Sequence, residues 1–175
     1  TTRRQDTIGP GRIFLDIKKS DNFQIPENIG CVFIVAGITN YGHCETDPDA
    51  WSVNVEEIPR LSSRFLKAGA FVFFVSTNTV FGGDHPWPGE DDPHHPKIAY
   101  SQQKSMSEVA IRNQAKELDC VDQLAVVRLT KIVGSNTSPF PNWFDSWKNG
   151  KVVRPFSDLI FAPISLDFAV KSLGI

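Results

Sequence analysis

The stretch FVFFVST, residues 71–77, decides the fold of this 175-residue chain. Five consecutive aromatic or β-branched residues that end in a hydroxyl pair predict a buried strand. In an open α/β sheet, ligands bind where such strands end. Tyr100 and Lys104 lie four residues apart at the start of a segment with helical spacing, so both side chains project from one helix face. A hydroxyl, a phenol and an ammonium are therefore predicted to meet around one substrate atom.

Other apolar runs alternate with helical patterns on both sides of this strand. We expect further strands at 12–17, 31–35 and 124–129, helices at 48–67 and 99–118, and a loop at 38–46. In the last part of the chain we expect a short helix at 143–148, one or two short strands within 152–161 and the start of a helix at 165–173. Strands separated by helices predict an α/β fold with a doubly wound parallel sheet.

Composition argues against several classes of protein. The net charge is -2 and both signs are mixed along the chain, so we expect neither nucleic acid nor a membrane as partner. No apolar run approaches the roughly 18 residues that span a bilayer. The three cysteines have no CxxC spacing, which predicts a protein of the reducing cytoplasm without a disulfide framework. The pairs His43-Cys44 and His94-His95 contain possible metal ligands, but neither has a second pair at ligand spacing, so we expect no metal.

Five segments carry a family resemblance. They are VAGITNYGHCETDPDAWSVNV (35–55), STNTVFGG (76–83) with an acidic loop after it, YSQQK (100–104), RLTKIVG (128–134) and DLIFAPISLDFA (158–169). In this order and spacing they resemble the extended short-chain dehydrogenases/reductases that act on nucleotide sugars, and among them dTDP-4-dehydrorhamnose reductase and its relatives. The motif YxxxK is weak alone, but its place after a strand that ends in Ser-Thr makes the set more specific.

The resemblance implies a Rossmann-like NAD(P)-dependent reductase or epimerase of a nucleotide-linked sugar. It implies that Thr77 is the catalytic hydroxyl, Tyr100 the acid/base and Lys104 the activating lysine, the last two also contacting the cofactor. The other cofactor-binding residues that it implies are Arg3, Arg4, Asp16, Ile17, Ala36, Gly37 and Asn54. Because the two arginines stand where relatives often hold a 2′-phosphate, NADP is somewhat favoured over NAD. A homodimer is also implied.

The chemistry of the predicted site follows from ordinary pKa values. A free tyrosine has a pKa near about 10, and a nearby ammonium favours the phenolate. We therefore expect Lys104 to lower the pKa of Tyr100 and Thr77 to hydrogen-bond the same substrate oxygen. Thr79 stands where the relatives that make GDP-fucose have a proton-transferring cysteine, so that added activity is not expected.

The predicted domains are a Rossmann-type NAD(P)-binding domain at 1–134 and part of a substrate-binding lobe at 135–175.

Two features depart from the family pattern. The glycine-rich pyrophosphate loop and the strand before it are not found, so we expect the chain to belong to a longer polypeptide. Leu159 and Ile164 replace polar residues of the family. They leave open a second hypothesis, a cofactor-binding or regulatory homologue without turnover.

Overall fold

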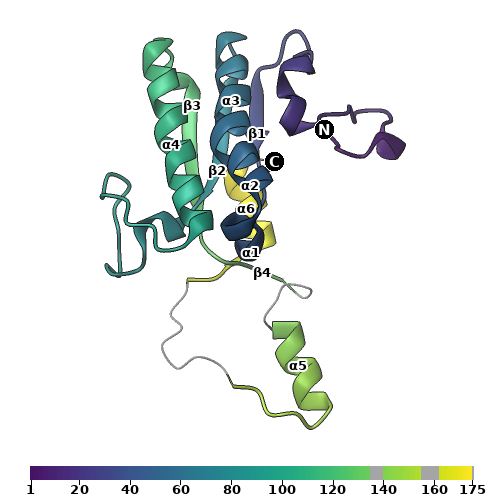
Figure 1. Cartoon of the computed structure of the whole chain (residues 1–175), viewed down its shortest axis with the longest axis vertical. Helices are drawn as coiled ribbons and strands as arrows, with labels where there is room; N and C mark the ends of the chain where they lie inside the picture. The colour runs from purple at the N-terminus through teal and green to yellow at the C-terminus, as the bar shows by residue number, and fades with distance from the viewer. Residues whose placement is uncertain (135–139, 155–161, 175) are drawn as a thin grey trace. The chain divides into compact units, whose positions relative to one another are not determined.

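The structure is a computed structural model that describes residues 1–134, 140–154 and 162–174 (Figure 1). The chain divides into two compact units, residues 1–128 and 129–175, which are described separately. None of the described helices is both long enough and apolar enough to cross a membrane.

A three-stranded sheet forms the centre of the first unit. Its strands are β1 (Cys31–Ile34), β2 (Phe71–Thr77) and β3 (Leu124–Leu129), in the order β1-β2-β3. β1 and β2 are parallel, with Cys31 opposite Phe71 and Ile34 opposite Phe74. The carboxyl ends of these two strands therefore lie at the same edge, and the predicted α/β class with a parallel sheet is confirmed.

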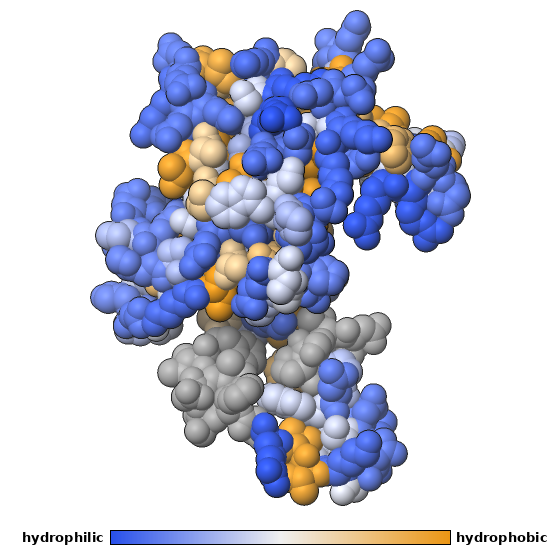
Figure 2. Space-filling view, viewed as in Figure 1, coloured by the Kyte–Doolittle hydropathy of each residue, from blue (hydrophilic) through white to orange (hydrophobic). Residues whose placement is uncertain are grey.

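Two helical segments pack against this sheet. The first contains α1 (Tyr41–Thr46), α2 (Pro48–Trp51), the π-helical η3 (Ser52–Glu57) and α3 (Ile58–Lys67), and the second is α4 (Ala99–Glu117). Figure 1 shows α3 and α4 side by side in front of the strands, and both contact β2. Figure 2 shows mostly hydrophilic side chains over the outer surface of this layer, with small hydrophobic patches between them.

The helix predicted at 48–67 begins at Pro48, where the Asp47 carboxylate accepts a hydrogen bond of 2.9 Å from Asp49 N. It is not a regular α-helix throughout, because the π-helical η3 precedes Pro59. Proline has no amide hydrogen to donate into the preceding turn, and this loosens the helical pattern there. The loop predicted at 38–46 is observed at 38–40 and is wrong over 41–46, which form α1. The Asn40 side chain caps this helix by accepting 3.0 Å from His43 N.

The core of the first unit lies between the sheet and the helices. Alternate residues of β2 point into it, and Val72 and Phe74 are completely buried. Their partners include Ile58 and Leu61 from the first helical segment and Ile111 from α4. Phe71, Phe73 and Val75, which alternate with these residues, are only half-buried, so this part of the strand buries one face more deeply than the other.

The strand predicted at 12–17 is wrong. In place of a strand, this segment forms two isolated bridges, a parallel one between Thr2 and Phe14 and an antiparallel one between Gly9 and Arg12. Asp16 then caps a 3-10 helix, η2 (Ile17–Asn22), by accepting 3.1 Å from Lys18 N. The shorter 3-10 turns are η1 (Gln5–Thr7), η4 (Asn78–Phe81) and η5 (Val121–Gln123).

The second unit contains a two-stranded parallel pair and two helices. They are β4 (Ile132–Val133), α5 (Phe140–Lys148), β5 (Ile164–Ser165) and α6 (Leu166–Leu173). The helices predicted at 143–148 and 165–173 are confirmed, and Ser165 caps α6 by accepting 3.1 Å from Phe168 N. Of the strands predicted within 152–161, residues 152–154 have no regular structure, and 155–161, including Leu159, lie outside the described residues.

Candidate active site at the carboxyl edge of the sheet

The candidate site lies where β1 and β2 end. Ala36 and Gly37 follow β1 and are exposed, whereas Thr77 ends β2 and is buried. α4 begins at Ala99, one residue before Tyr100, and it packs against both β2 and α1. The predicted catalytic residues therefore lie on two elements that contact each other.

A chain of hydroxyls links Thr77 to the start of α4. The Thr77 Oγ1 accepts a hydrogen bond of 3.3 Å from Thr79 N and lies 3.1 Å from Thr79 Oγ1. Ser101 Oγ in turn donates to Thr79 Oγ1 at 2.6 Å. Because Ser101 follows Tyr100 directly, these bonds fix the end of β2 relative to the turn that carries the phenol.

Lys104 anchors α4 to β2 one turn further on. Its Nζ donates 2.6 Å to the carbonyl oxygen of Val75 and lies 4.0 Å from the centre of the Phe74 ring. The side chain is buried, and burial lowers the pKa of Lys104 to about 8, against the opposing charge of Glu108. An ammonium here is held by the backbone of β2.

Tyr100 is half-buried, with its ring 5.6 Å from that of Tyr41. Burial raises the pKa of Tyr100 to about 12, with smaller contributions from Tyr41 and Cys44. The prediction that Lys104 lowers this pKa is therefore wrong for the chain as described, because desolvation of the phenolate dominates and the Lys104 ammonium is bonded to Val75.

Asn54 connects the loop after β1 with α4. Its Oδ1 accepts 2.9 Å from Ile38 N, and its Nδ2 donates to Ile38 O at 2.9 Å and to Gln103 Oε1 at 2.8 Å. A Cβ on Gly37, where φ is +154°, would lie 3.1 Å from Asn54 Oδ1, so this approach favours glycine. The amide of Asn54 is used inside the protein, and its contact with a cofactor stays a prediction.

The N-terminal cofactor candidates are engaged with their own segment. The Arg4 guanidinium binds the Asp6 carboxylate, with Nε 3.1 Å from Oδ1, while Arg3 is exposed. Asp16 caps η2, and Ile17 packs against the hydrophobic core. No hydrogen bond or ion pair between described residues joins these four to Thr77, Tyr100 or Lys104.

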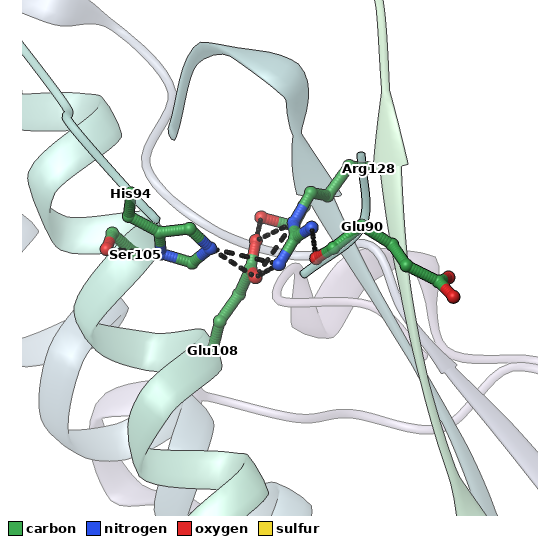
Figure 3. Close-up of polar contacts among 6 residues, drawn as sticks. Glu90, His94, Ser105, Glu108 and Arg128 are labelled. Atoms are coloured by element: carbon green, nitrogen blue, oxygen red, sulfur yellow. Dashed lines mark hydrogen bonds and ion pairs between the residues drawn. The ribbon is translucent and has the colours of Figure 1, made fainter. Parts of the chain in front are cut away.

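Figure 3 shows a charged cluster around Glu108 that the sequence did not reveal. The carboxylate of Glu108, completely buried in α4, accepts hydrogen bonds from Ser76 Oγ and from the guanidinium of Arg128, whose Nη2 is 2.8 Å away. His94 lies 3.5 Å from the same carboxylate, and burial lowers the pKa of His94. The four-residue spacing of Lys104 and Glu108 was the available signal, since it places both on one helix face.

No group of three or more His, Cys, Asp or Glu side chains that could hold a metal ion is found in the described ranges.

Residues 6–165 match the family described as the RmlD substrate binding domain. The chain belongs to this family. The match covers the first unit almost completely and extends into the second, so the RmlD family assignment includes all the residues of the candidate site except Arg3 and Arg4.

Comparison with solved structures shows that this chain has a Rossmann-like fold, which is also found in nucleotide-sugar enzymes. A UDP-galactose 4-epimerase is 21% identical with a TM-score of 0.74 and covers 97% of this chain, and the match covers 58% of that chain. MoeE5 in complex with UDP-glucuronic acid and NAD is 22% identical with a TM-score of 0.71. The match covers 91% of this chain and 54% of the MoeE5 chain.

A dTDP-4-dehydrorhamnose reductase from Clostridium acetobutylicum is 22% identical with a TM-score of 0.69, covering 83% of this chain and 51% of that chain. The chain thus spans about half the length of these proteins. No curated protein matches its sequence. The family match and the shared fold confirm the resemblance to extended short-chain dehydrogenases/reductases.

Proposed function

We propose that this chain carries the catalytic residues of an NAD(P)-dependent reductase or epimerase of a nucleotide-linked sugar. The observation that supports this proposal is the set of hydrogen bonds that holds α4, the helix of Tyr100 and Lys104, to the end of β2 at Thr77. They run through Thr79 and Ser101 and from Lys104 to Val75. The family match and the UDP- and dTDP-sugar enzymes among its structural neighbours support the class of substrate.

The dinucleotide is proposed to bind at the edge of the sheet where β1 ends. Ala36 and Gly37 are exposed after β1, and Gly37 has no side chain that would stand between its backbone and a ligand. A bound nicotinamide would give or take a hydride at the sugar carbon. Arg3 and Arg4 are proposed to bind a 2′-phosphate, and Asp16 and Ile17 to approach the adenine. Both NADP and NAD are compatible with this arrangement.

The protonation states of the chain suit delivery of a proton to a carbonyl oxygen. With a pKa of about 12, Tyr100 keeps its proton at neutral pH and can donate it as the alcohol forms. Among the described residues, none hydrogen-bonds the Tyr100 hydroxyl, which supports a role for it toward a ligand. Thr77 would donate to the same substrate oxygen, and Lys104 is proposed to contact the cofactor.

The test compares wild-type protein with Tyr100→Phe, which keeps the ring and removes the proton donor. Turnover is measured with NADH and NADPH against dTDP-4-dehydrorhamnose and a panel of UDP-linked keto sugars. We expect turnover in the wild type and a loss of more than about tenfold in kcat for the variant. Tyr41→Phe is the matched control, since it removes the only other phenol of the chain, and it should retain activity within about twofold.

Equal turnover of wild type and Tyr100→Phe would contradict the proposal. It would favour the second hypothesis, a cofactor-binding or regulatory homologue, which titration with NADPH and NADH would then test through binding alone.

A further inference from the structure

The end of β2 is attached to α4 at two consecutive residues. Lys104 Nζ donates 2.6 Å to Val75 O, and Ser76 Oγ donates to the Glu108 carboxylate. Lys104 and Glu108 are one helical turn apart, so the two bonds act on the same face of the helix. Thr77 follows Ser76 directly, and its position therefore depends on both bonds.

Glu108 is itself held from β3. Glu108 Oε2 accepts from Nε and Nη2 of the Arg128 guanidinium at 3.0 and 2.8 Å, and Oε1, which accepts from Ser76, lies 3.3 Å from the same Nε. Glu108 is completely buried, so an unpaired carboxylate there would be costly, and this two-point bond gives it a fixed orientation. The oxygen that accepts from Ser76 thus has a defined place.

The same guanidinium holds the loop that follows β2. Arg128 Nη1 donates 2.7 Å to Glu90 O, and Nη2 lies 2.9 Å from His94 Nε2. The His94 Nδ1 is 2.7 Å from Ser105 Oγ on α4, as Figure 3 shows. One buried cluster therefore joins β2, β3, α4 and this loop around the candidate site.

We propose that Glu108 is a positioning residue of the Thr77-Tyr100-Lys104 site, which fixes the end of β2 through Ser76 and keeps Lys104 charged. Its effect on turnover rests on the proposed function, whereas its effect on Lys104 does not. Neither Glu108 nor Ser76 is placed in contact with substrate.

The charges around Glu108 support this role. Burial lowers the pKa of Lys104, and the Glu108 carboxylate opposes that effect. The other groups that face Glu108 are Arg128 from β3 and His94 from the loop, with Arg112 acting on His94. Replacing Glu108 by a neutral residue leaves burial to act on Lys104 without this opposing charge, so the Lys104 ammonium becomes less stable.

The first test measures Lys104 directly, without any substrate. The protein is labelled with 13C at lysine Cε, and the Lys104 resonance, assigned through Lys104→Met, is titrated by NMR in wild type and Glu108→Gln. We expect the titration of Lys104 to move to lower pH by roughly half a unit or more in the variant. An unchanged titration in a folded variant would overturn the charge part of the proposal.

The second test removes only the hydroxyl that ties β2 to Glu108. Ser76→Ala keeps every charge of the cluster, and Ser20→Ala is its matched control, because Ser20 Oγ also donates to a buried carboxylate, that of Glu57 at 2.8 Å. In Ser76→Ala the amide of Thr79, which donates to Thr77 Oγ1, should exchange with solvent faster, and kcat should fall about threefold or more with KM within about twofold.

Ser20→Ala should change neither the exchange of the Thr79 amide nor kcat, even if it lowers the free energy of unfolding as much as Ser76→Ala does. Equal Thr79 exchange in the two variants would overturn the positioning role of Glu108. If the wild type turns over no sugar, the proposed function fails, and amide exchange together with the Lys104 titration still decides this inference.

Discussion

Asn54 joins the loop after β1 to α4 through one amide group. Both of its Nδ2 hydrogens and its Oδ1 are used, and Gln103 extends the contact by donating 2.9 Å to Cys44 O. All of these groups are away from bulk solvent, so each lost bond would leave a polar atom without a partner. The residue therefore stabilises the edge of the sheet on which Gly37 lies.

Replacing Asn54 by Ala should lower the free energy of unfolding by about 1–3 kcal/mol, because the Ile38 backbone and Gln103 lose their partner. The measurement is urea unfolding. Asn149→Ala is the control, since the exposed Asn149 makes a single side-chain bond of 2.7 Å to Asp145 O and should change stability by less than about 0.5 kcal/mol. Equal losses in both variants would show that the Asn54 bonds contribute little.

At the scale of elements, α4 shows what the sequence could and could not predict. The helix at 99–118 follows from its spacing and is observed at Ala99–Glu117. Its inward face, however, is largely polar, and the buried side chains include Ser101, Gln103, Lys104, Ser107 and Glu108. Polar residues on a helix normally face solvent, so their partners could be recognised only once β2 and β3 were in place.

The strands differ in the same way. The apolar runs that became β1, β2 and β3 were predicted because buried parallel strands have a strong local pattern. The run at 12–17 has a similar pattern but forms only isolated bridges to Thr2 and Gly9 in the described residues. Backbone pairing depends on a neighbouring strand that no local pattern specifies. Thr77, Tyr100 and Lys104 could be named from their motif, whereas Glu108 and Arg128 required the geometry.

The loop after η4 returns so closely to its own start that its first residue must be glycine. A Cβ on Gly82, where φ is +74°, would lie 2.2 Å from the backbone oxygen of His95, whose amide donates 2.9 Å to Val80 O. Gly83 has a similar φ of +79° with nothing within 4 Å of its Cβ. An alanine at either position would have a left-handed backbone, but only at Gly82 would its Cβ also clash with the backbone of His95.

Gly83→Ala should therefore cost about 1–2 kcal/mol, from the left-handed backbone alone. Gly82→Ala should cost more, because the backbone at His95 must also move. Hydrogen exchange at the His95 amide measures the difference locally, and it should be faster in Gly82→Ala than in Gly83→Ala. Identical exchange rates would mean that the loop accommodates the methyl group without losing the bond to Val80.

At the scale of the whole molecule, the two site residues with shifted pKa values affect stability in opposite directions at alkaline pH. Lys104 has a pKa of about 8 when folded and an ordinary value of 10.5, so the unfolded chain binds more protons between these limits. Stability from Lys104 is present above 10.5 and is lost as the pH falls through about 8. Tyr100, raised from 10.0 to about 12, contributes stability that is present below 10.0 and is lost as the pH rises through about 12.

The free energy of unfolding of the wild type, compared with that of Lys104→Met, should therefore rise between pH 8 and 10.5, by up to about 3 kcal/mol. Methionine cannot titrate, so the difference isolates Lys104 from the other lysines, which titrate in both proteins. Urea unfolding at a series of pH values gives this difference, and Tyr100→Phe should separately remove the fall above pH 10.0. A constant difference across this range would mean that Lys104 is hydrated in solution, and a hydrated ammonium would not be held at the backbone of β2 beside Thr77.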